Sequence, residues 1–174
     1  MAETIPEVLS SASPAGCLEV MTRAVFQTGV SWKQIAVHWD AYGAAFSQFD
    51  PELVARYDAL DVERAIATPG ILGSPRKARA TVANAKALSQ ALREHGSFAG
   101  YVRSFASYET LAKDFKKRFS FMGAMNVWYV LFRTGQPVPP FEEWIVTIPG
   151  DHPRMREMVD RARREGRSPE LGRG

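Results

Sequence analysis

The segment TPGILGSPRKARATVANAK, Thr68 to Lys86, combines residue types that favour the binding of an anion. Its prolines and glycines predict a tight turn, and the alanine-rich stretch that follows predicts a helix beginning at Pro75. Arg76, Lys77 and Arg79 then lie in the first turns of that helix, where the helix dipole makes cations unfavourable by about 0.3–1 kcal/mol. A bound phosphate would reverse this balance, because backbone N–H groups, the dipole and the basic side chains all favour a negative charge.

The turn itself is suited to a close approach between backbone and ligand. Gly70 and Gly73 can take positive φ and carry no side chain to obstruct a phosphate, and Ser74 is placed to cap the helix. We therefore predict a helical hairpin at residues 68–75 that contacts nucleic-acid phosphate through Gly70, Gly73, Ser74, Arg76 and Lys77. An ordinary helical hairpin with solvated basic side chains remains the alternative.

The composition of the whole chain fits a globular protein with a substantial core. It has 174 residues, of which 45% are hydrophobic and 24% charged, and a formal net charge of +3. From Arg154 onward there are seven arginines and four acidic residues, so the excess charge lies near the C-terminus and the rest is neutral. Attraction of the main body to DNA must therefore come from a local patch.

Cysteine and histidine are too few and too irregularly spaced for a metal site. Cys17 is the single cysteine, and the three histidines are His38, His95 and His152. We therefore expect no metal and no other cofactor. No apolar stretch approaches the roughly 18 residues of a membrane span, and the first residues lack the pattern of a signal peptide, so we expect a cytoplasmic protein without membrane contact.

Capping and breaker residues divide nearly the whole chain into helices, which predicts an all-α helical bundle. The expected helices are 17–27, 32–46, 51–57, 62–67, 75–93, 98–105, 108–119, 121–135 and 152–166. Residues 136–144 are expected to be a loop, and 143–150 are the one weak strand candidate. The stretch 121–135 is apolar on nearly all sides, which predicts a buried central helix.

These elements suggest three regions. Residues 1–150 are expected to form a helical domain that contains the hairpin. Residues 151–166 form an amphipathic helix that packs on this domain through Met155, Met158, Val159 and Ala162. Residues 167–174 are expected to be disordered.

Several motifs, in order and at similar separations, resemble the 3-methyladenine DNA glycosylase I family of the helix-hairpin-helix superfamily. The resemblance covers about residues 25–135 and rests on linked motifs, which makes it specific. The matching residues are Gln27, Gly29, Ser31, Trp32, Phe49, Asp50, Pro51, Asp61, Val62, Glu63, Gly70, Ile71, Lys77, Asn84, Ala85, Phe121 and Gly123.

The resemblance implies which residues enclose a base. Trp32 matches the family tryptophan that stacks on the base, and Gln27 is placed to hydrogen-bond the base edge or to cap a turn. Tyr129 replaces a serine that borders the family pocket, so it is expected to supply a new pocket wall. The structural alternatives are a core tryptophan at Trp32 and a buried aromatic at Tyr129.

The sequence also departs from the family. The pocket glutamate is replaced by Ala24, so the catalytic group is unknown, and Glu19, Glu142, Glu143 and Asp151 are weak substitutes. The aromatic N-terminal segment of the family is not matched. Neither are its zinc ligands, one of which would fall at Pro140.

The implied activity is that of a monofunctional DNA glycosylase, which hydrolyses the N-glycosidic bond of alkylated purines such as 3-methyladenine in double-stranded DNA. It would flip out the base and stack it on an aromatic ring, and we expect a monomer. The main alternative is a non-catalytic helix-hairpin-helix DNA-binding protein with a degenerate pocket. A helical protein-interaction module is disfavoured by the basic hairpin.

Overall fold

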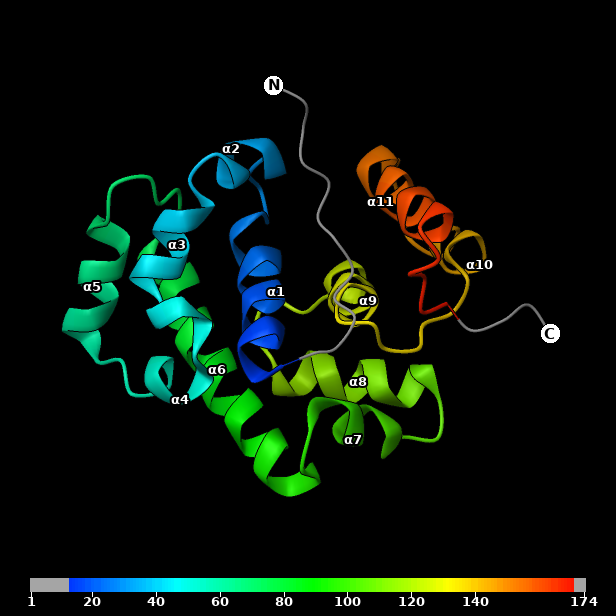
Figure 1. The fold of residues 1–174 in the computed structure, drawn as a ribbon, viewed down its shortest axis with the longest axis horizontal. Helices are drawn as coiled ribbons and strands as arrows, with labels where there is room; N and C mark the ends of the chain where they lie inside the picture. The colour runs from blue at the N-terminus through cyan, green and yellow to red at the C-terminus, as the bar shows by residue number, and fades with distance from the viewer. Residues whose placement is uncertain (1–12, 171–174) are drawn as a thin grey trace.

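The structure is a computed structural model that describes residues 13–170, and these residues form helices joined by short connections (Figure 1). Within that span no strand forms, and a single isolated bridge links Val138 with Glu170. The all-α prediction is therefore confirmed. No helix between residues 13 and 170 has both the length and the apolar character needed to cross a bilayer.

The α-helices are α1 (Pro14–Phe26), α2 (Trp32–Ala36), α3 (Trp39–Ala45), α4 (Pro51–Val54), α5 (Ala59–Ala67), α6 (Pro75–His95), α7 (Phe98–Arg103), α8 (Tyr108–Arg118), α9 (Ala124–Arg133), α10 (Phe141–Ile145) and α11 (Pro153–Arg164). A short 3-10 turn, η1 (Ser47–Phe49), separates α3 from α4.

Helix α1 lies at the centre of the fold and packs against both α6 and α9. Figure 1 shows α3, α4 and α5 on one side of α1, and α10 and α11 on the other, with α9 seen end-on between them. Helix α9 is buried along most of its length, including Trp128, Val130 and Leu131, as its uniformly apolar sequence predicts. This arrangement leaves the C-terminal end of α1 facing both α9 and α11.

Several of the expected helices have different bounds. Helix α5, expected at 62–67, begins at Ala59, because Asp58 caps it by accepting a hydrogen bond from the amide of Asp61. Helix α1 begins at Pro14 rather than Cys17, because Ser13 caps it by accepting a hydrogen bond from the amide of Gly16. The helix expected at residues 32–46 is two helices, α2 and α3, separated at Val37 and His38. The break brings His38 against the hairpin, where its side chain would lie 3.0 Å from a Cβ at Gly70.

The prediction of a loop at residues 136–144 is wrong for its last part, which begins α10. Pro139 and Pro140 precede the helix and therefore do not interrupt it, and Glu142 and Glu143 lie in its first turn, where the helix dipole favours acidic residues. The weak strand candidate at 143–150 is likewise helix and turn.

The C-terminal helix was expected to pack through Met155, Met158, Val159 and Ala162. Helix α11 buries Met158, Val159 and Ala162, and Met155 is half-buried. The expected disorder from Arg167 onward is wrong for residues 167–170, because Glu170 is held by several hydrogen bonds. The rest of that segment, 171–174, and residues 1–12 lie outside the described residues.

Burial of the single cysteine gives a first testable prediction. The Cys17 side chain is fully buried in α1, and this burial raises the pKa of its thiol to about 12. Native protein at about pH 8 should therefore resist alkylation by iodoacetamide, whereas unfolded protein, with a thiol pKa near about 8.5, should react quickly. Mass spectrometry of both samples provides the measurement, and rapid labelling of the native protein would contradict the packing of α1.

Candidate functional site

A cavity of about 480 Å³ opens where the C-terminal end of α1, α9 and α11 meet. Its volume lies within the range of small-molecule pockets, roughly 300–1,000 Å³. All three residues predicted to form a base pocket line it. The lining residues are Gln27, Thr28, Val30, Ser31, Trp32, Met125, Asn126, Tyr129, Ile148, His152, Arg154, Met155 and Met158.

The first wall is the turn that joins α1 to α2. Gln27 follows the last residue of α1, and Gly29 allows the chain to reverse because its φ is 75°. Ser31 then caps α2 through a reciprocal pair of hydrogen bonds with Gln34. This cap fixes Trp32 as the first residue of α2, so its ring lies at the cavity with 8% of its surface exposed.

Lys77 on α6 stabilises this wall through hydrogen bonds to its backbone. Its Nζ donates hydrogen bonds to the carbonyl oxygens of Phe26, at 2.9 Å, and Thr28, at 2.7 Å. These bonds satisfy carbonyls that the end of α1 leaves without helical partners. Partial burial lowers the pKa of the Lys77 ammonium. The residue that was predicted to contact phosphate therefore also joins the start of α6 to the pocket wall.

The second wall belongs to α9. Tyr129 lies at the cavity, and its hydroxyl accepts a hydrogen bond of 2.8 Å from Nη1 of the buried Arg133. Asn126, one turn earlier, donates to the carbonyl oxygens of Phe121, at 2.7 Å, and Ala24, at 3.4 Å. These bonds connect α9 to α1 and fix the orientation of the polar side chains in this wall.

The third wall comes from α11 and the turn before it, which the sequence reasoning missed. His152, Arg154, Met155 and Met158 line the cavity from this side. The helical stripe containing Met155 and Met158 was recognised as a packing face. Met155 and Met158, the N-terminal part of this stripe, line the cavity. The sequence could not indicate this, because it depends on where α11 lies relative to α1.

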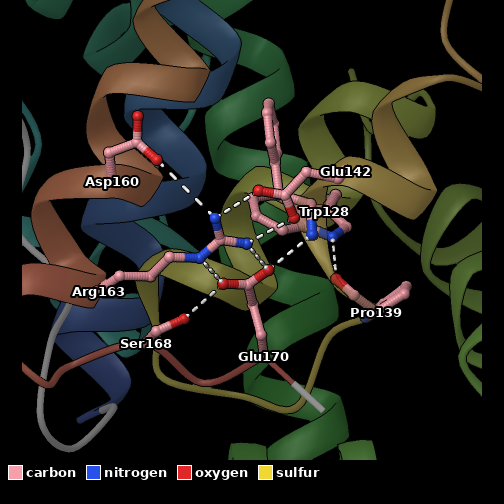
Figure 2. A network of polar contacts seen from close by, with 8 residues as sticks. Trp128, Pro139, Glu142, Asp160, Arg163, Ser168 and Glu170 are labelled. Carbon is pink, nitrogen blue, oxygen red and sulfur yellow. Dashed lines mark hydrogen bonds and ion pairs between the residues drawn. The ribbon is translucent and has the colours of Figure 1, made fainter. Parts of the chain in front are cut away.

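A cluster of polar contacts around Arg163 holds α11 in place (Figure 2). The Arg163 guanidinium donates to Glu170, with Nε to Oε1 at 2.6 Å, and to Glu142 on α10, with Nη2 to Oε2 at 2.7 Å. Glu170 also accepts from the Phe141 amide and from the Ser168 hydroxyl. The Arg163 cluster thus ties the described C-terminal end of the chain to both α10 and α11.

We predict that Glu170→Gln destabilises the protein by about 1–2 kcal/mol at pH 7, because it weakens charge-assisted hydrogen bonds. Burial alone would raise the pKa of the Glu170 carboxyl, but hydrogen bonds from Arg163, Phe141 and Ser168 outweigh it and hold that pKa below its ordinary value. A carboxyl with a lowered folded-state pKa contributes stability above its unfolded-state pKa of about 4.3, and this contribution is lost as the pH falls through the folded-state pKa.

Urea unfolding at a series of pH values tests this prediction. The difference in unfolding free energy between the parent protein and Glu170→Gln should be largest at neutral pH and should shrink below about pH 4. Glu143→Gln, an exposed acid on α10, is the matched control and should change little. A difference that does not vary with pH would contradict an ionic role for Glu170.

The predicted hairpin joins α5 to α6. Gly70 has a φ of 96°, which confirms the positive φ expected there, but Gly73 is required for a different reason. A Cβ on Gly73 would lie 2.5 Å from Cε1 of the buried Phe26, so only glycine allows the hairpin to pack against the end of α1. Ser74 caps α6 as predicted, by accepting a 3.4 Å hydrogen bond from the Lys77 amide.

The basic side chains at the start of α6 differ in their surroundings. Arg76 and Arg79 are exposed, whereas Lys77 is partly buried against α1. The Arg76 guanidinium lies 5.1 Å from the ring centroid of Phe121, which has a φ of 62°. The Phe121 carbonyl oxygen accepts the hydrogen bond from Asn126, which lines the cavity. Phe121 therefore contacts both Arg76 at the start of α6 and the cavity wall formed by α9.

Among the described residues, no aspartate or glutamate lines the cavity. Ala24, at the position expected for the family glutamate, is fully buried in α1. Glu19 instead accepts a 2.9 Å hydrogen bond from Trp39 Nε1, and Asp151 pairs with Arg156 on the surface. The described lining of the pocket therefore offers stacking surface and amide groups, but no carboxylate that could act as an acid or base.

Residues 13–170 contain no group of three or more His, Cys, Asp or Glu side chains arranged to hold a metal ion. At the position where the resemblance implies a zinc-binding histidine, Pro140 precedes α10 instead, and the Arg163 cluster lies beside it. The donor groups of the described residues therefore do not fit the family's zinc site.

An all-α chain with a tryptophan-lined cavity beside a glycine-containing hairpin is the arrangement expected of a base-removing DNA repair protein. Residues 13–127 match the family model described as Methyladenine glycosylase, and the chain belongs to that family. The resemblance inferred from the sequence motifs is thus confirmed. The second half of α9, α10 and α11 lie beyond the matched residues.

Individual relatives agree with this assignment. The chain is similar to DNA-3-methyladenine glycosylase of Haemophilus influenzae, with 31% identity over 88 residues that cover 51% of this chain and 48% of the relative. It is also similar to DNA-3-methyladenine glycosylase 1 of Escherichia coli, with 35% identity over 83 residues, 48% of this chain and 44% of the relative. The match spans about half the length of these curated relatives.

A solved structure of 3-methyladenine DNA glycosylase I from Staphylococcus aureus, studied for its recognition of 3-methyladenine, has the same fold. The TM-score is 0.63 and the identity 26%, over 75% of this chain and 79% of that chain. The similarity of fold thus extends over more of the chain than the sequence matches to the curated relatives.

Proposed function

We propose that this protein is a DNA glycosylase that hydrolyses the N-glycosidic bond of an alkylated purine such as 3-methyladenine in double-stranded DNA. The observation that carries the proposal is that Trp32, Gln27 and Tyr129 line one cavity of suitable size. The family of the chain and the names of its relatives support the same activity.

The cavity accounts for the base-binding step of such a reaction. A glycosylase must rotate the target nucleotide out of the duplex, because its glycosidic bond is inaccessible within the stack. The flipped base would stack on Trp32, while the Gln27 and Asn126 amides are available for its polar edge. Met155 and Met158, whose side chains adapt easily to irregular shapes, would close the site from α11.

The absence of a carboxylate among the described lining residues is compatible with this chemistry. In an alkylated purine nucleotide the ring is a cation, so the C1′–N bond breaks with its electron pair passing to the base, which leaves neutral. Water then adds to the sugar cation at C1′ and loses a proton to the solvent. No protonation of the leaving group is needed, and the loss of a general acid or base would cost less than the typical factor of about 10²–10⁴.

The hairpin is proposed to position the duplex. Exposed Arg76 and Arg79 at the start of α6 supply positive charge, and Gly70 and Ser74 present backbone where a phosphate would lie. Lys77 is proposed to act mainly through the pocket wall that it holds. We further propose a cytoplasmic monomer that makes no covalent intermediate with its substrate.

The decisive experiment is the single-turnover release of free bases from methylated duplex DNA, separated by chromatography. Release of 3-methyladenine above the spontaneous rate is expected, and the set of released bases would define the specificity. Retained DNA binding without base release would instead favour a non-catalytic DNA-binding protein, which is supported by the lack of a carboxylate among the described lining residues.

A further inference from the structure

A second cleft, of about 840 Å³, adjoins the cavity that Trp32 lines. It lies between the loop that joins α8 to α9 and the turn that follows α10. Four residues line both spaces, namely Thr28, Met125, Asn126 and Ile148. These side chains form a common border, so the cleft is next to the proposed base site but is not used by the proposed base-binding step.

Phe121 lines this second cleft in a strained backbone conformation. Its φ is 62°, a left-handed value that a bulky residue seldom adopts. Such strain persists only where the surrounding structure holds it, and it is found most often at functional sites. The Phe121 carbonyl oxygen accepts a 2.7 Å hydrogen bond from Asn126. On the other side, Asn84 bonds to both the amide and the carbonyl oxygen of Ser120. The loop is therefore anchored at two points, which holds the Phe121 ring at the cleft.

Positive charge lies close to the Phe121 ring. The Arg76 guanidinium is 5.1 Å from the ring centroid, and Lys116, in the last turn of α8, lines the same cleft. Both basic residues are exposed. No aspartate or glutamate is among the described residues that line the cleft. A phosphate would therefore be attracted to this part of the surface.

An aromatic ring beside a basic side chain is a combination with which proteins bind an unstacked nucleotide. The base stacks on the ring and the cation contacts the phosphate, without preference for one sequence. Rotation of a target nucleotide out of a duplex removes a stacking partner from each of its neighbours. A neighbour that moves onto Phe121 would regain a stacking contact. Because the cleft and the cavity share a border, consecutive nucleotides of one strand can occupy the two.

We propose that the second cleft is a subsite for the nucleotide that adjoins the target on the same DNA strand. Phe121 stacks on the base of this neighbouring nucleotide, and Lys116 contacts its phosphate. The inference rests on the proposed function, because a neighbouring nucleotide is brought to the cleft only when the target enters the cavity.

The test uses duplex DNA in which a stable abasic analogue, tetrahydrofuran, replaces the target nucleoside, so that no base is excised. In a second duplex the neighbour on the 5′ side also lacks its base, and in a third duplex the neighbour on the 3′ side lacks it. Fluorescence anisotropy with full-length protein gives the dissociation constants. The neighbour effect is the ratio of the constants measured without and with the neighbouring base.

The neighbour effect of the parent protein should exceed that of Phe121→Leu by on the order of tenfold on one side of the target, because leucine lacks an aromatic face. Phe121→Tyr, which retains the ring, should behave like the parent. Comparison between proteins cancels any change in the flexibility of the DNA itself. Phe105→Leu is the matched control and should keep the parent's neighbour effect, because Phe105 is also half-buried but lines neither space.

The phosphate contact is tested separately. Lys116→Met should reduce the slope of log K against log salt by about one unit. Lys117→Met is the control, because Lys117 is exposed on the same turn but does not line the cleft, and its slope should change less. A Lys116→Met slope equal to that of the parent would overturn the phosphate contact, so the proposal remains falsifiable if Phe121→Leu does not fold.

The outcomes separate this subsite from the proposed activity. Neighbour effects that are equal in the parent protein and in Phe121→Leu on both sides would overturn the subsite, while base release from methylated DNA would leave the proposed function intact. Neighbour-dependent binding without any base release would overturn only the proposed enzymatic function. Failure of the parent protein both to bind these duplexes and to release base would overturn both proposals.

Discussion

Replacing Trp32 by alanine should lower the single-turnover rate of base release by about a hundredfold, while affinity for undamaged DNA changes less than about threefold. The reason is that stacking of one base on an aromatic side chain contributes about 1–3 kcal/mol, and Trp32 provides the largest ring at the cavity. The hairpin, which is proposed to supply phosphate contacts, is left in place. Trp32→Phe, which retains an aromatic face, should recover much of the lost rate.

The stability of this variant must be measured alongside its activity. Trp32 is 8% exposed, and truncation of a buried tryptophan destabilises a protein by about 3–5 kcal/mol. Trp144→Ala provides a matched control, because Trp144 is 7% exposed, belongs to α10 and is not among the residues that line the cavity. Equal loss of base release in the two variants, at a temperature where both are folded, would mean that Trp32 is only structural.

The second large effect is expected at Lys77. Lys77→Met should lower the free energy of unfolding by about 1–3 kcal/mol, because the Phe26 and Thr28 carbonyls lose charged donors. It should also reduce base release more strongly than DNA affinity, because the turn carrying Gln27 is no longer held to α6. Urea unfolding, base release and DNA binding measured on the same preparation would separate these contributions.

Arg76→Ala is the matched comparison on the same helix turn. Arg76 is exposed, so its loss should hardly affect folding, weaken binding similarly on all DNA sequences and reduce the slope of log K against log salt by about one unit. If Lys77→Met reproduced this pattern without loss of stability, Lys77 would be a phosphate contact after all. An unchanged salt slope in Arg76→Ala would remove Arg76 from the DNA interface.

Much of the fold could be predicted because local chemistry marks the helix boundaries. Asp50 followed by Pro51, and Ser74 followed by Pro75, cap their helices as expected. The predictions failed where contacts between distant segments determine the local structure. The break at His38 depends on packing under the hairpin, and Glu170 is ordered by Arg163, which no local pattern indicates.

The residues of the candidate site could likewise be identified from the sequence only where a local motif marks them. Gln27, Trp32 and Tyr129 were identified through motifs, and the structure brings them to one cavity. Lys77 was recognised as a special cation, but its partners are carbonyls 49 and 51 residues away, beyond the reach of sequence spacing. Arg23 resembles any other basic residue on a helix until its guanidinium is seen to lie against the rings of both Trp32 and Trp39.

The third wall of the cavity has a consequence for how such a protein can diversify. Helix α11 lies beyond the residues matched to the family, yet Met155 and Met158 line the pocket. Substitutions on this one helix face could therefore alter which bases are accepted, while the hairpin, α1 and α9 continue to provide a stable framework. Evolution of substrate range and retention of DNA affinity would then be carried by separate parts of the chain.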